Sequence, residues 1–238
     1  MLGVFLSNIS NFKNKKLIIF DLDGTLIDSA SDLALAVNDM LRILNRSCFE
    51  EKIIDSWVGN GAKMLVSRAL SGSVNVDENL DKELFDKALT IFLDSYKNNL
   101  CVKTHLYPNV FETLESLKKM GFTFAICTNK PYDFVEPILK ILKINDMFEI
   151  VLGGDSLDKK KPDPAPLLHI MEKLNYTLAD SIMVGDSKND ILSANSAGID
   201  SIGVSYGYNY GEDISLYNPS VVVDDFKDIT KFFGNGDG

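Results

Sequence analysis

Apolar residues follow two patterns along the chain, short continuous runs and helical periodicity. Leu17 to Phe20 is a run of four apolar residues, two of them β-branched, which predicts a buried strand. After residue 107, similar short runs alternate with segments of helical spacing. The pattern predicts strands over 122–127, 148–152, 181–184, 199–204 and 221–223, and helices over 109–120, 132–142, 164–174, 189–197 and 226–233. This regular alternation indicates an α/β fold with a doubly wound, Rossmann-like parallel sheet.

Between residues 30 and 100 the pattern is helical throughout. It predicts helices over 32–44, 50–57, 62–70 and 78–98. A parallel α/β sheet does not leave such a gap after its first strand, so the segment indicates a separate, inserted all-helical domain. We therefore expect a core domain formed by 1–28 and 104–238, and a helical domain formed by 29–103.

The composition is that of a globular protein with a negative surface. Of the 238 residues, 45% are hydrophobic and 24% are charged, and the formal net charge is −10. This charge argues against nucleic acid and anionic membranes as partners, and no apolar run is long enough to span a membrane. An anionic substrate therefore needs local attraction, from a metal ion and a few placed cations.

The cysteines and the N-terminal segment favour a cytoplasmic protein. Cys48, Cys101 and Cys127 give an odd count without CxxC spacing, which is typical of reduced thiols. Residues 1–12 lack a basic start and a cleavage-site pattern, so we expect a short leader extension and no signal peptide. Residues 234–238 are expected to be frayed.

The first predicted strand ends in two carboxylates. Asp21 and Asp23 are spaced i, i+2, so an extended chain points both side chains the same way, at the strand end where α/β sheets bind ligands. Two like charges this close repel each other, which favours a cation, a proton on one carboxyl group, or both. Gly24 permits a sharp turn after the acids. Taken alone, the segment also fits an Asp-rich turn.

Three later strand ends carry polar side chains of complementary kinds. Thr128 and Asn129 follow one strand, where a hydroxyl and the free N–H groups of a helix start can hold a phosphate oxygen. Lys161 precedes a proline-rich segment that can fix the lysine in place. Asp186 ends a further strand and Asp190 lies in the next helical turn, so both carboxylates can face one point and bind Mg²⁺. Each feature alone also fits a helix cap or a solvated loop.

Taken together, the four strand ends are not explained by capping and turns. Their order, Asp-x-Asp, Thr, Lys and Asp-x-x-x-Asp, resembles the four motifs of the haloacid dehalogenase-like (HAD) superfamily in its phosphatase form, most specifically through the string DLDGTLIDS. The resemblance covers residues 17–27 and 106–223, and the helical insertion lies where that superfamily carries a cap domain. It implies a Mg²⁺-dependent phosphatase of a small anionic phosphomonoester, and we expect a monomer or a homodimer.

The resemblance also implies catalytic roles for the first two acids. Asp21 would attack phosphorus and form an aspartyl-phosphate. Asp23 would protonate the leaving group and then accept a proton from the attacking water. Haloacid dehalogenases lack an equivalent of Asp23, so its presence favours phosphate transfer over dehalogenation.

The remaining motif residues are implied to hold the phosphate and the metal ion. The phosphoryl oxygens would be bound by Thr128, Asn129, Lys161 and Gly24, with Thr128 and Lys161 counted among the catalytic residues. The metal ion would be bound by Asp21, Asp186 and the backbone carbonyl of Asp23, with Asp190 outside its direct ligands or linked through water.

Two segments point to the substrate. Residues 57–70 and 203–208 resemble segments of phosphoglycolate phosphatases. A Gly-Asn-Gly string before a helix exposes N–H groups that favour a carboxylate, so Asn60 and Gly61 are predicted to contact the non-phosphate end of the substrate. An ordinary interhelix turn explains the same string equally well.

Several functions share these features. The narrow hypothesis is hydrolysis of 2-phosphoglycolate to glycolate and phosphate. A pyrophosphatase or a β-phosphoglucomutase-like phosphotransferase would share the core motifs and stays open. A receiver domain also combines Asp, Thr, Lys and a metal in a doubly wound sheet, but it lacks an early helical insertion.

Overall fold

The computed structural model describes residues 12–233, so the leader extension expected over 1–12, apart from Phe12, and the fraying expected over 234–238 lie outside the described residues. The strands are β1 (Leu17–Phe20), β2 (Ile27–Asp28), β3 (His105–Leu106), β4 (Thr123–Cys127), β5 (Ile150–Leu152), β6 (Ser181–Gly185), β7 (Asp200–Val204) and β8 (Val221–Val223). The α-helices are α1 (Ala30–Ile43), α2 (Glu51–Asp55), α3 (Ala62–Ser71), α4 (Lys82–Asn98), α5 (Val110–Lys119), α6 (Tyr132–Ile141), α7 (Ala165–Leu174) and α8 (Lys188–Ala197). The 3₁₀ helices are η1 (Asn145–Met147), η2 (Asn209–Gly211), η3 (Ile214–Tyr217) and η4 (Phe226–Phe232).

Six strands form one parallel sheet in the order β5-β4-β1-β6-β7-β8. Strand β1 lies between β4 and β6, where the strand order changes direction. Such a switch point opens a crevice at the carboxyl ends of the strands, which is where doubly wound folds bind their ligands. The predicted fold class is confirmed, and Asp21 follows β1 at this crevice.

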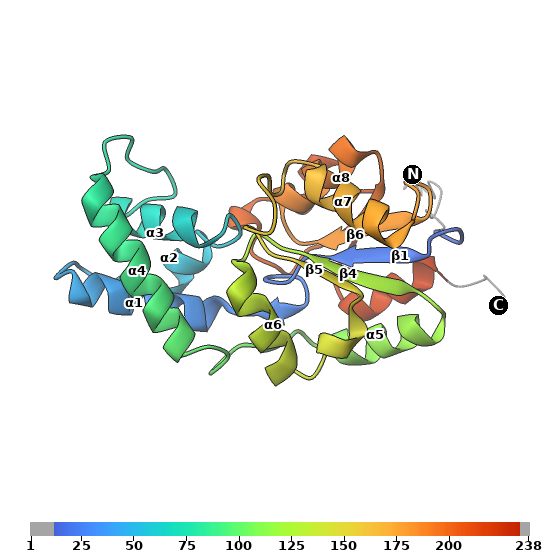
Figure 1. Cartoon of the computed structure of the whole chain (residues 1–238), viewed down its shortest axis with the longest axis horizontal. Coiled ribbons are helices and arrows are strands. Elements are labelled where there is room, and N and C mark those ends of the chain that lie inside the picture. The colour runs from blue at the N-terminus through green and yellow to red at the C-terminus, as the bar shows by residue number, and fades with distance from the viewer. Residues whose placement is uncertain (1–11, 234–238) are drawn as a thin grey trace, which may run out of the picture.

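Helices cover both faces of the sheet (Figure 1), and the alternation along β1 explains why. Leu17 and Ile19 pack in a cluster with apolar residues of α7, whereas Ile18 and Phe20 pack in a cluster with apolar residues of α5 and α6. All four β1 side chains are buried. A strand buried on both faces needs a continuous apolar run, which is the pattern that the sequence shows.

Helices α1 to α4 lie between β2 and β3 in sequence and form a group beyond one end of the sheet (Figure 1). Helix α1 packs against α2 and α4, and α3 packs against α4. We call this group the cap. The division into domains at 28/29 and 103/104 stays a prediction. Asp28 ends β2, and Thr104 directly precedes β3.

Four elements differ from the sequence predictions. Helix α4 begins at Lys82 and not near residue 78, because Asp81 caps it by accepting a 2.7 Å hydrogen bond from the Leu84 N–H. The terminal segment from Phe226 is a short 3₁₀ helix, not an α-helix. Strands β2 and β3 pair antiparallel over two residues each, too few to give a periodic signal. None of the described helices is both long and apolar enough to cross a membrane.

A buried carboxylate joins the two chain segments that connect the cap to the sheet. Asp32 of α1 is 1% exposed and accepts hydrogen bonds from the Lys103 N–H at 2.9 Å, the Thr104 N–H at 2.9 Å and the Thr104 hydroxyl at 2.7 Å. These bonds hold the segment before β3, where the chain returns from the cap, against the start of α1, where the chain enters it.

We expect Asp32→Ala to lower the free energy of unfolding by about 3 kcal/mol, because it leaves buried donors of Thr104 without an acceptor. Denaturant unfolding measures the change. The control is Asp86→Ala on the exposed side of α4, whose ion pair with Lys82 spans 4.0 Å and which should cost at most about 0.5 kcal/mol. Equal losses in the two variants would contradict this account of Asp32.

Candidate active site

Asp21, directly after β1, shares a buried lysine with Asp190. Asp21 Oδ1 lies 2.9 Å from Lys161 Nζ, and the same Nζ lies 2.5 Å from Asp190 Oδ1 at the start of α8. Lys161 is 2% exposed and Asp190 is fully buried. Asp21 Oδ1 stands at ion-pair distance from the lysine but has no hydrogen-bond partner of regular geometry among the described residues. It therefore retains bonding capacity.

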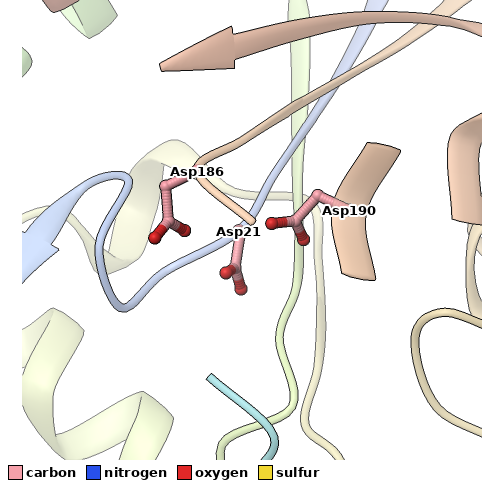
Figure 2. A group of neighbouring side chains, drawn as sticks. All are labelled: Asp21, Asp186 and Asp190. Carbon is pink, nitrogen blue, oxygen red and sulfur yellow. The ribbon is translucent and has the colours of Figure 1, made fainter. Parts of the chain in front are cut away.

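Asp186, at the end of β6, completes a group of three carboxylates (Figure 2). One carboxylate oxygen of each of Asp21, Asp186 and Asp190 lies within 4.8 Å of the other two. Asp186 is oriented by hydrogen bonds from the Thr25 hydroxyl at 3.2 Å and the Tyr208 N–H at 2.8 Å. Asp190 is oriented by a capping box with Ser187 at the start of α8.

The electrostatics of this group favour a bound cation. Burial raises the pKa of Asp21 to about 7, against the attraction of Lys161. Burial, with the repulsion of Asp190 and Asp21, also raises the pKa of Asp186 well above its usual range. Three carboxylates and one lysine carry a formal charge of −2 (three negative, one positive), which a divalent ion would balance. Buried carboxylate oxygens are the donor set that Mg²⁺ prefers, so the residues present fit the predicted ion.

Asp23 is paired with a second buried lysine that the sequence analysis did not identify. Lys130 Nζ lies 2.9 Å from Asp23 Oδ1 and 3.0 Å from Oδ2, and the Ser29 hydroxyl donates to Oδ1 at 2.6 Å. Lys130 is 5% exposed. Burial would lower its pKa, but Asp23 and Tyr96 hold it above the usual range. The side chain of Asp23 is therefore outside the group of three carboxylates, and whether its backbone carbonyl binds the metal stays a prediction.

A small cavity of about 40 Å³ lies between the cap and the strand ends. Its apolar walls are Leu33, Val58, Leu65, Phe92 and Phe134. Its polar residues are Asp21, Asp23, Thr128, Asn129, Lys130 and Tyr96. Two of the predicted phosphate-binding residues, Thr128 and Asn129, thus line the same cavity as Asp21, and Lys161 contacts the Asp21 carboxylate.

The Gly59–Gly61 segment of the cap rests on the sheet domain. The Gly59 carbonyl accepts hydrogen bonds from the side-chain amides of Asn129 at 3.3 Å and Asn189 at 3.2 Å. The Asn60 carbonyl accepts from Lys160 Nζ at 2.8 Å. Gly61 lines the cavity, but Asn60 is not among the residues that line it. The structure thus brings only one of the two predicted cap residues to the cavity.

Gly24 lies against Asp186 and is not among the residues that line the cavity. Its φ of +87° favours glycine, and a Cβ atom there would come within 2.3 Å of Asp186 Oδ2. The residue was predicted beside the phosphate, whereas its observed contact is with a carboxylate of the acidic group.

Lys130 and Tyr208 are the main residues that sequence reasoning missed. The Tyr208 hydroxyl donates to Asp28 at 2.9 Å and accepts from the N–H groups of Ser29 at 2.9 Å and Ala30 at 3.1 Å, where the chain enters the cap. Tyr208 lies in the segment 203–208, which resembles phosphoglycolate phosphatases but from which no role for Tyr208 was predicted. For Lys130 the only signal is its position in the Thr-Asn-Lys-Pro string, since nothing local distinguishes a buried lysine from an exposed one.

Known proteins resemble the chain over nearly its whole length. Residues 18–204 match the family model described as haloacid dehalogenase-like hydrolase. A phosphoglycolate phosphatase of Colwellia psychrerythraea is 54% identical over 217 residues, 91% of this chain and 96% of the relative. One of Psychrobacter arcticus is 51% identical over 220 residues, 92% of this chain and 96% of the relative.

A solved structure agrees with these relatives. The crystal structure of a predicted phosphoglycolate phosphatase from Haemophilus somnus has a TM-score of 0.86 and 41% identity, and the match covers 93% of this chain and 99% of that one. The predicted superfamily and the prediction of a phosphoric monoester hydrolase are confirmed. The chain belongs to the haloacid dehalogenase-like hydrolase family.

Proposed function

We propose that the protein is a Mg²⁺-dependent phosphatase that hydrolyses 2-phosphoglycolate through an aspartyl-phosphate on Asp21. The observation that carries the proposal is the pairing of Asp21 with Lys161 within a buried acidic group, at a small cavity that also holds Asp23. Relatives named phosphoglycolate phosphatase support the substrate.

The metal ion would be held by Asp21 and Asp186, with Asp190 beside them. When bound, the ion would offset the repulsion between the carboxylate of Asp21 and the anionic substrate. Asp190 has one oxygen on Lys161 and the other on Ser187, so both of its oxygens are already engaged. This favours an orienting role for Asp190, outside the direct ligands.

In the first half-reaction a carboxylate oxygen of Asp21 attacks phosphorus, and the bond from phosphorus to the substrate's ester oxygen breaks. Asp23 gives a proton to that oxygen, which leaves as an alcohol. Lys161 and Thr128 hold the phosphoryl oxygens. Lys161 contacts Asp21, and Thr128 lines the cavity that Asp21 also lines. In the second half-reaction, Asp23 takes a proton from water, whose oxygen attacks phosphorus and releases Asp21 and inorganic phosphate.

The cavity adjoins a wider pocket. The two share Gly61, Asn129 and Phe134, and the wider pocket has a volume of about 920 Å³. A pyrophosphatase and a β-phosphoglucomutase-like phosphotransferase remain the alternatives, and a substrate panel separates them from the proposed function.

We expect Gly24→Ala to weaken Mg²⁺ binding at least about 10-fold, because the added Cβ displaces the Asp186 carboxylate. Isothermal titration calorimetry with Mg²⁺ measures the affinity. Gly121→Ala is a matched control: its φ is +90°, but nothing lies within 4 Å of the added Cβ. Both variants should lose about 1 kcal/mol of stability from the left-handed conformation. Unchanged Mg²⁺ affinity in Gly24→Ala would refute the assignment of Asp186.

Asp21→Asn should reduce kcat at least about 1000-fold, because an amide cannot serve as the nucleophile. The variant conserves side-chain size, so thermal unfolding should still show a folded protein. Asp86→Asn, an exposed change in the cap, should retain the activity of the unchanged protein. Near-normal turnover by Asp21→Asn would rule out the covalent mechanism.

A substrate panel tests the narrow assignment. The kcat/KM for 2-phosphoglycolate should exceed that for pyrophosphate and for β-glucose 1-phosphate by at least about 10-fold. A chelator should abolish the activity and added Mg²⁺ should restore it. If 2-phosphoglycolate is no better than the other two, the assignment fails.

A further inference from the structure

Lys130 supplies the positive charge of the cavity. Among the described residues that line the cavity, it is the one lysine or arginine, and it is 5% exposed. Lys161, the other buried lysine of the site, is already bound to Asp21 and Asp190. Lys161 does not line the cavity, whereas Lys130 lines it and is paired there with Asp23 alone, so Lys130 is the cation that a ligand group in the cavity would meet.

The ammonium group of Lys130 is held in place but has donor capacity left. Two of its contacts go to the oxygens of Asp23, at 2.9 and 3.0 Å. An ammonium has three N–H donors, so one remains, for the Tyr96 hydroxyl beside it or for a ligand. The Tyr96 ring of helix α4 lies beside it, with its centroid 4.8 Å from Nζ.

The Tyr96 hydroxyl is a second donor in the same cavity. The residue is 1% exposed, and its hydroxyl has no hydrogen-bond partner of regular geometry among the described residues, although the Lys130 ammonium lies beside its oxygen. The hydroxyl proton therefore has no acceptor among them. Burial raises its pKa to about 12, so the hydroxyl keeps its proton. The ring is fixed by stacking on Phe92 at 6.0 Å and by an edge contact with Phe134 at 5.0 Å. A buried hydroxyl without a partner is costly, which favours an acceptor on the ligand.

We propose that Lys130 and Tyr96 form the subsite that binds a carboxylate at the non-phosphate end of the substrate. This inference rests on the proposed function, because it names the groups that recognise the glycolate carboxylate. It also shifts recognition away from Asn60, whose carbonyl is taken by Lys160 and which does not line the cavity. The buried ammonium of Lys130 matches a carboxylate in charge, and the fixed hydroxyl of Tyr96 can donate a hydrogen bond to it. A methyl group offers neither a charge nor an acceptor.

The subsite explains how two negative groups can share a small cavity. A substrate carboxylate would approach Asp23, which carries the same charge until it takes up the proton that it gives to the leaving group. Lys130 lies against Asp23 and can contact both carboxylates at once, so it would screen their repulsion. A substrate without a carboxylate would gain nothing from this arrangement.

The test compares 2-phosphoglycolate with ethyl phosphate, in which a methyl group replaces the carboxylate. The measured quantity is the ratio of kcat/KM for the two substrates, which does not depend on the fraction of folded enzyme. The ratio should fall about 100-fold in Lys130→Met and about 10-fold in Tyr96→Phe, while Lys130→Arg should recover part of it. The matched control is Lys97→Met, an exposed lysine next to Tyr96 on α4, which should leave the ratio unchanged.

The outcomes separate this inference from the proposed function. An unchanged ratio in both Lys130→Met and Tyr96→Phe overturns the subsite while the phosphatase assignment stands. Equal losses on both substrates also overturn it, because they show that Lys130 acts only through Asp23. If the unchanged enzyme does not turn over 2-phosphoglycolate, the proposed function itself fails.

Discussion

The burial of three carboxylates around one lysine is the constraint on which the site depends. Charged groups leave water at a high cost, and Lys161 offsets part of that cost by contacting Asp21 and Asp190 together. These contacts join the end of β1, the segment before α7 and the start of α8. The remaining negative charge is not balanced by the described side chains of the group, so the fold is suited to a divalent cation at this position.

Asp21 and Asp23 are the same kind of side chain, and they differ in environment because each is paired with a different lysine. Asp21 contacts Lys161 within the acidic group, whereas Asp23 contacts Lys130 and Ser29 outside it. Two adjacent carboxylates thus occupy separate environments, which a nucleophile and an acid–base group require. Because Lys130 also contacts the Tyr96 ring, the environment of Asp23 includes the cap.

The sequence predicts the part of the site that is local. A buried strand needs a continuous apolar run, and its end needs turn residues, so the residue pattern alone places Asp21, Thr128 and Asp186 at strand ends. It does not place Lys130, because the burial of a lysine depends on Asp23 and Tyr96, 107 and 34 positions away in the sequence. Tyr208 and the β2–β3 pair were not predicted for the same reason. Their contacts join residues far apart in the sequence and leave no periodic pattern in it.

Tyr208 connects the acidic group to the entrance of the cap within one residue. Its backbone N–H donates to Asp186, while its hydroxyl bonds Asp28, Ser29 and Ala30. A displacement of the chain at Ser29 would therefore act on the ring of Tyr208, and through its backbone on Asp186. Ser29 also donates to Asp23, so the same segment contacts both halves of the site. The position of the cap and the geometry of the carboxylates are consequently linked by direct contacts, without a longer chain of intermediates.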